Sequence, residues 1–182
     1  MLKPQDIAVT LKYALLQDQY PSFEQVAQSL GMTASNVHLS VKRSIAAKLL
    51  EQPGKRSIKP IRTHILEFLI HGARYAFYAE RGAPVRGTPT AHAAAPLQAH
   101  FNADNNPPVW PDPHGTAFGP SLQPLFKTAA FAAERDPKLY ELLALTDALR
   151  AGKIRERTLA QDYLKKRLLE DNWSRSTSTE IN

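Results

Sequence analysis

The side chains with the clearest chemical potential are hydroxyl, amide and cationic groups between residues 33 and 43. Asn36 can form two hydrogen bonds with the edge of an adenine, and Arg43 can do so with a guanine or can hold a phosphate. Hydroxyl groups at a helix start lie beside backbone amides that bind phosphate readily. This chemistry is recognition of nucleic acid. The candidate base- and groove-contacting residues are Thr33, Ser35, Asn36, His38, Leu39, Lys42 and Arg43.

The positive charge of the chain is concentrated around the same residues. The 182 residues have a net charge of +6, and residues 33–62 alone hold seven lysines and arginines against one acidic residue. A basic patch of this kind is typical of a protein with a polyanionic partner, although a solvated basic face is the other interpretation. The candidate phosphate-contacting residues are Lys55, Arg56, Lys59 and Arg62.

Catalytic and metal-binding patterns are weak by comparison. The chain has no cysteine, and none of its six histidines is followed by another at the fourth position. It has no glycine-rich phosphate loop and no Gly-x-Ser-x-Gly motif. We therefore expect neither an enzyme nor a metal or cofactor site.

Three helices are predicted to position the candidate residues. Ser22 and Gln25 form a capping box at the start of the second helix, and Gly31 ends that helix in a left-handed turn. Thr33 caps a third helix over 34–50, in which Val37 and Val41 share one apolar face. The opposite face of this third helix is then free for a partner.

Residues 26–37, VAQSLGMTASNV, resemble the helix-turn-helix of MarR-type winged-helix transcriptional regulators. The similarity continues through Lys42 and Arg43 to Leu49-Leu50, and it covers about residues 3–62. It implies that the third helix enters a DNA major groove and that helices flanking the winged domain form a homodimer. A β-hairpin wing is expected at 52–60, where Pro53-Gly54 indicates a turn, but this segment is short and lacks alternating apolar residues.

Four further segments follow the predicted winged domain of residues 1–62. Apolar spacing predicts one long connecting or dimerisation helix over 63–80. Nine prolines and four glycines in 82–124 predict a proline-rich extended arm over 81–124, for which a disordered linker is the alternative. Helical periodicity returns in 125–172, where a helical hairpin with a dimerisation role is expected, and 173–182 reads as a disordered tail.

The sequence therefore predicts a mainly α protein: a winged helix-turn-helix with a short or vestigial wing, a long helix, a proline-rich arm and a C-terminal helical hairpin. The expected function is that of a cytoplasmic, dimeric DNA-binding regulator, an autorepressor that reads a near-palindromic operator in double-stranded DNA. The competing hypothesis is a protein-interaction module, such as an antitoxin or adaptor, that binds a protein partner through the arm and the C-terminal helices. No apolar run reaches the roughly 20 residues needed to span a membrane.

Overall fold

The computed structural model describes residues 1–16, 19–54, 57–102 and 105–170, and its first part contains the three predicted helices. These are α1 (Pro4–Leu15), α2 (Phe23–Leu30) and α3 (Ala34–Ala46). The third helix was predicted to reach residue 50, but it ends at Ala46. Lys48 adopts a left-handed conformation with φ of 60°, which turns the chain out of the helix and into a strand.

The predicted caps of α2 and α3 are confirmed. Ser22 Oγ accepts from the Gln25 amide at 3.2 Å, and the Ser22 amide donates to Gln25 Oε1 at 2.8 Å. Gly31 has a φ of 65° and ends α2, while Thr33 Oγ1 accepts from the Asn36 amide at 3.2 Å. The angle between the two helices is therefore set by a turn that both caps define.

A short antiparallel hairpin follows α3. Its strands are β1 (Leu50–Gly54) and β2 (Ser57–Pro60), with Leu50 opposite Pro60 and Glu51 opposite Lys59. Ile58 is the buried residue of β2 and fixes the hairpin to the helices. Residues 55–56, at the predicted tip, lie outside the described residues.

The prediction of one helix over 63–80 is wrong, because two shorter helices occupy this segment. They are α4 (Arg62–His71) and α5 (Ala73–Ala76), and Gly72 interrupts them. A Cβ at Gly72 would lie 3.0 Å from the Phe68 ring, so the ring occupies the space that a side chain would need. The backbone leaves helical geometry at Phe77, and the chain continues as a strand from Arg81.

The prediction of an extended arm over 81–124 is also wrong. The segment forms β3 (Arg81–Pro89), the 3-10 turns η1 (Ala91–Ala93) and η2 (Leu97–His100), β4 (Val109–Pro111) and β5 (Ala117–Leu122). Strand β3 is antiparallel to both β4 and β5, and these two pair in parallel to close a small barrel. Proline is compatible with these strands because its φ angle suits an extended backbone. Pro84 also lies beside a shift in the β3–β5 register, where the missing backbone amide is tolerated.

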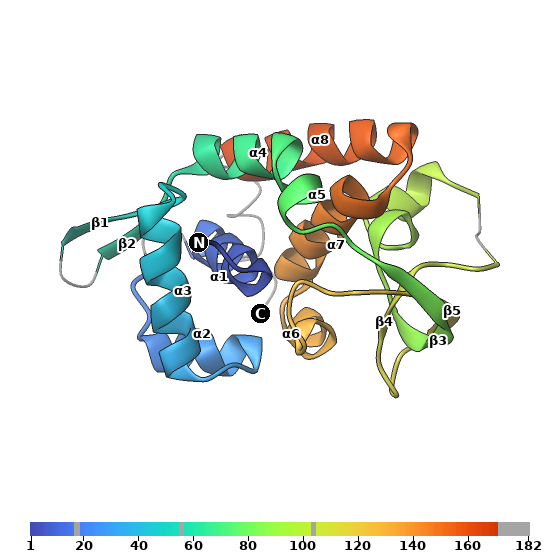
Figure 1. Cartoon of the computed structure of the whole chain (residues 1–182), viewed down its shortest axis with the longest axis horizontal. Coiled ribbons are helices and arrows are strands. Elements are labelled where there is room, and N and C mark those ends of the chain that lie inside the picture. The colour runs from blue at the N-terminus through green and yellow to red at the C-terminus, as the bar shows by residue number, and fades with distance from the viewer. Residues whose placement is uncertain (17–18, 55–56, 103–104, 171–182) are drawn as a thin grey trace, which may run out of the picture.

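The C-terminal part contains α6 (Ala129–Arg135), α7 (Pro137–Ala151) and α8 (Ile154–Leu169). Asp136 caps α7 by accepting from the Leu139 amide at 3.0 Å, and Pro137 is the first residue of the helix. Figure 1 shows α4 and α8 side by side above α7, with α1–α3 and the hairpin on one side and β3–β5 on the other. Helix α7 is the centre of the core, and ten of its 15 residues are buried. It has therefore little apolar surface left for the predicted dimer contact.

No helix among the described residues combines the length and the apolar character that a membrane crossing requires. The predicted disordered tail at 173–182 lies outside the described residues.

The buried phenol of Tyr13 makes stability sensitive to alkaline pH. Its hydroxyl has no hydrogen-bond partner within the described residues, and burial raises its pKa to about 12. Since the unfolded side chain ionises near pH 10, the unfolded state loses its proton first, and stability falls as the pH rises from about 10 to 12. We expect Tyr13→Phe to leave stability near pH 7 almost unchanged and to reduce this alkaline loss, measured by urea unfolding across that range. An identical alkaline loss in the variant would contradict this assignment.

Candidate functional site

Helix α3 separates its side chains into a buried face and an exposed face. Val37 and Val41 are buried against the core, so the helix is held by one side only. The opposite face presents polar and cationic side chains together with Leu39, whose side chain is 45% exposed. The exposed residues of this face are Ser35, Asn36, His38, Leu39 and Lys42. An exposed leucine beside an amide and a cation suits a base edge that carries a methyl group.

Two of the predicted groove residues also have structural tasks. Thr33 caps α3, and the His38 ring lies 5.2 Å from the ring of Phe23 in α2. These contacts orient the start of α3 on α2. The other exposed side chains of this face are available for a partner. They are Ser35, Asn36, Leu39 and Lys42.

Arg43 is partly exposed and forms an ion pair with a buried carboxylate. Its Nε and Nη2 atoms donate to the two carboxylate oxygens of Asp6 at 2.7 Å each, and the Asp6 side chain is fully buried. The hydrogen bond with Asp6 raises the pKa of Arg43 above its ordinary value. This pair ties α3 to α1 through the Nε and Nη2 edge of the guanidinium, so these two donors are not available for the predicted base contact. Sequence reasoning missed Asp6 because the two residues lie 37 positions apart.

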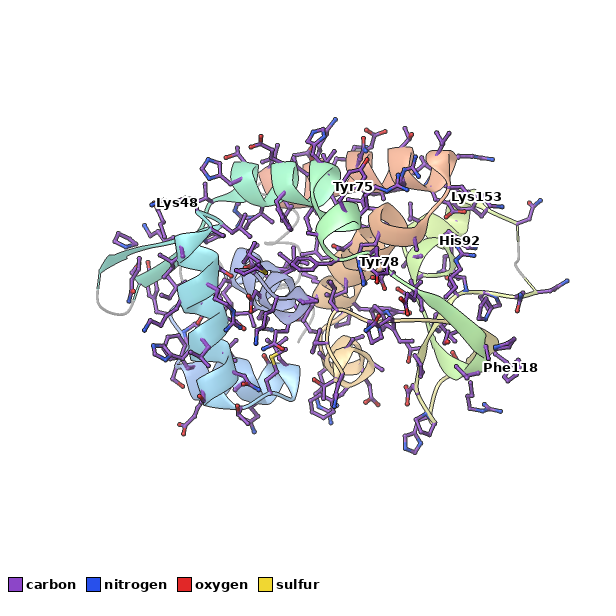
Figure 2. All side chains as sticks on the ribbon, viewed as in Figure 1. Lys48, Tyr75, Tyr78, His92, Phe118 and Lys153 are labelled. Atoms are coloured by element: carbon purple, nitrogen blue, oxygen red, sulfur yellow. The ribbon has the colours of Figure 1, made fainter. Side chains whose placement is uncertain are left out.

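The predicted phosphate contacts are placed differently from one another. Lys59 is exposed on β2 and lies opposite Glu51, which partly offsets its charge. Arg62 points away from the hairpin, since its Nη1 donates to the Leu168 carbonyl at 3.1 Å. Lys55 and Arg56 lie outside the described residues. Lys48, which the sequence analysis did not include in the site, is exposed where α3 meets the hairpin (Figure 2).

A groove continues the exposed face of α3 towards the C-terminal part of the chain. Thr33 and Asn36 line it on one side, and the segment between β5 and α6 lines it on the other. Among the residues that the structure describes, the charged side chains that line it are Lys3 and Lys127, and none is a carboxylate. Both lysines come from outside the basic window of residues 33–62, so only the folded chain brings them to this face.

A second polar cluster is buried in the core and is fully bonded. Asp147 Oδ2 accepts from Trp110 Nε1 at 2.6 Å and from the Thr90 hydroxyl at 2.9 Å, while Oδ1 pairs with Arg150 at 2.6 Å. Burial raises the pKa of Asp147, and Arg150 and the two donors oppose that rise. Arg150 also donates to the carbonyls of Phe77 and Gln123. This cluster joins the barrel to α7 and is structural.

In the part of the chain that the structure describes, no group of three histidine, aspartate or glutamate side chains is arranged to hold a metal ion. A scan of protein-family models finds no match to this chain, and neither the curated proteins nor the solved structures that were searched include a match. The exposed face of α3, with the hairpin and the lysine-lined groove beside it, is therefore the candidate site on geometric grounds.

Proposed function

We propose that this protein is a sequence-specific DNA-binding transcriptional regulator, with α1–α3 and the hairpin acting as a winged helix-turn-helix of the MarR type. The observation that supports this most is the division of α3 into a buried valine face and an exposed face with Ser35, Asn36, Leu39 and Lys42. In the proposal this exposed face enters the major groove. Asn36 reads an adenine, Leu39 contacts a thymine methyl group, and Lys42 holds a phosphate.

The distribution of cations supports a DNA backbone on both sides of α3. Lys48 and Lys59 are exposed at the hairpin end of the helix, and Lys3 and Lys127 line the groove at its start. Phosphate contacts of this kind fix the register of a helix in the groove without reading sequence. Arg43 has no part in base recognition in this proposal, because the bond of its Nε and Nη2 donors to Asp6 holds the guanidinium against α1.

We further propose that two copies act together in the cytoplasm as an autorepressor on a near-palindromic operator. Since α7 is buried, the contact between copies must use other surfaces. The α5 residue Tyr75 is 77% exposed and Tyr78, which follows α5, is 65% exposed (Figure 2). Tyrosine is enriched at protein interfaces, so we place the contact on the surface that these two residues share with α4.

The competing proposal, a protein-interaction module, used the proline arm together with the C-terminal helices. Val109 and Trp110 are the large apolar residues at the centre of the predicted arm, and both are buried in the chain itself. The folded arm therefore offers no support for that mode of binding, and we propose the DNA-binding function in preference.

Binding is expected to depend steeply on salt. With about 6–10 phosphate contacts in a dimer, affinity should fall roughly 10³–10⁵-fold between 50 and 200 mM salt. Fluorescence anisotropy with the duplex upstream of the protein's own gene, and with a scrambled duplex of the same composition, measures this. We expect the upstream duplex to bind more tightly than the scrambled one at about 150 mM salt, with a Kd in the rough range of 10⁻⁸–10⁻¹¹ M. Affinity that does not change with salt would contradict the proposed contacts.

A further inference from the structure

A cavity of about 580 Å³ is lined by residues of the barrel, of the segment after β3 and of α6. Small side chains leave this space open, and they come from the segment after β3 and from α6. The alanines that line it are Ala93, Ala94, Ala95, Ala130 and Ala133. Its volume is within the range of roughly 300–1,000 Å³ that is typical of small-molecule sites.

The charged side chain best placed to orient a ligand in this cavity is Asp112. One of its oxygens accepts from the Thr88 hydroxyl at 2.9 Å, and the other accepts from the His114 amide at 3.0 Å. Both oxygens are thereby fixed in direction and still have lone pairs for a further donor. Among the described residues no lysine or arginine lines the cavity, although the chain as a whole is basic, and His114 is the lining imidazole.

The other charged side chains near the cavity make contacts of their own, and the Arg135 guanidinium lies 3.7 Å from the centroid of the Phe131 ring. Glu134 lies at the rim and pairs with Arg135 at 3.3 Å. Arg86 is bound to the Gly115 carbonyl at 3.3 Å. Asp112 is therefore the lining carboxylate whose described contacts include no cation, and it is suited to a positively charged donor.

Aromatic and apolar walls surround the rest of the space. Tyr140 lines the cavity, and its hydroxyl donates to the Pro89 carbonyl at 2.6 Å. Burial raises the pKa of Tyr140 to about 12, so it stays neutral near pH 7. Phe131 of α6 supplies a second ring. A ligand for this site therefore combines a cationic head with a flat or aliphatic body.

Phe131 also connects the cavity to the turn before α3. A Cβ placed on Gly31 would lie 3.0 Å from the Phe131 ring, so the ring already touches the glycine of the turn. Beside it, the Thr128 hydroxyl donates to the Leu30 carbonyl at 2.8 Å. A ligand that moves Phe131 would therefore move the residues that set the angle of α3.

We propose that this cavity binds a small organic cation, a primary amine on an aromatic or aliphatic body, with its ammonium group on Asp112. We also propose that the bound amine alters the DNA affinity of α3 through Phe131 and Gly31. The second part rests on the proposed DNA-binding function, whereas the first part does not.

Calorimetric titration with phenethylamine tests the binding site, with phenylacetate as a probe of similar body and opposite charge. We expect the amine to bind with a Kd below about 1 mM and Asp112→Asn to weaken it about tenfold. The control Asp162→Asn, which changes an exposed carboxylate on α8, should bind the amine as the natural chain does. Equal binding of amine and acid, no binding of the amine, or an unchanged affinity in Asp112→Asn would overturn the site.

DNA anisotropy at a saturating amine concentration tests the coupling. We expect the amine to change DNA affinity severalfold in the natural chain but less in Thr128→Val, which removes the hydrogen bond to the Leu30 carbonyl and does not alter a residue that lines the cavity. This variant should still bind the amine by calorimetry. Unchanged DNA affinity in an amine-saturated protein that binds DNA overturns the coupling and leaves the site intact. If the natural chain binds no DNA even without the amine, while it binds the amine by calorimetry, the proposed function is overturned instead.

Discussion

The double variant Asn36→Ala with Lys42→Ala is expected to bind its operator about 100-fold more weakly than the natural chain. Each good pair of hydrogen bonds to a base is worth about 1–3 kcal/mol, and each lost phosphate contact lowers the salt slope by about one. Both side chains are exposed, so their removal leaves the core of α3 unchanged. Anisotropy with the operator duplex, over a range of salt concentrations, measures both effects.

The matched control for this variant is Asn102→Ala with Lys165→Ala. It removes one amide and one cation of the same types from exposed positions away from α3. We expect this control to keep the full affinity, and we expect the same thermal unfolding temperature in both double variants. Equal loss in the two variants would show that binding depends on overall charge and would contradict a role for the α3 face. Arg43→Ala is unsuitable here, because it would leave Asp6 buried without its cation.

The largest effect on stability is expected for Asp147→Ala. This substitution leaves Arg150 buried without its carboxylate and also removes the acceptor of Trp110 and Thr90. Breaking a buried ion pair in this way costs about 3–5 kcal/mol, a large part of the roughly 5–15 kcal/mol that keeps a domain folded. Urea unfolding followed by tryptophan fluorescence and by circular dichroism measures the loss.

A double variant distinguishes the ion pair from general damage to α7. Asp147→Ala with Arg150→Met removes both charges. We therefore expect the double variant to lose less unfolding free energy than the sum of the losses in the two single variants. Asp162→Ala, on the exposed surface of α8, is the control and should change stability by less than about 0.5 kcal/mol. Additive losses in the double variant would contradict a specific pairing of the two residues.

The features that could be predicted from the sequence are those set by near neighbours. The capping box at Ser22 and Gln25, the left-handed Gly31 and the caps at Thr33 and Asp136 each involve residues three or four positions apart. Their local hydrogen bonds determine where helices begin and end. The exposed face of α3 followed from this, because periodicity identifies the buried valines.

The features that could not be predicted depend on contacts between distant residues. Asp147 and Thr90 lie 57 positions apart, and a proline-rich run gives no local sign that its Trp110 will bond to a helix further along the chain. The ion pair of Arg43 could not be predicted for the same reason, because its partner Asp6 lies 37 positions away in the sequence. Gly72 was expected to be tolerated inside a helix, but the Phe68 ring and the turn towards β3 make it a break.

The most direct test of the DNA-binding proposal is selection of binding sites by the full chain from a library of random duplexes, with sequencing of the bound fraction. The proposal predicts one enriched motif made of two inverted half-sites, with centres one or two helical turns apart and an adenine preference that Asn36→Ala removes. The inverted repeat also tests the proposed dimer. A bound fraction with the same sequence composition as the starting library, obtained with folded protein, would contradict sequence-specific recognition by α3.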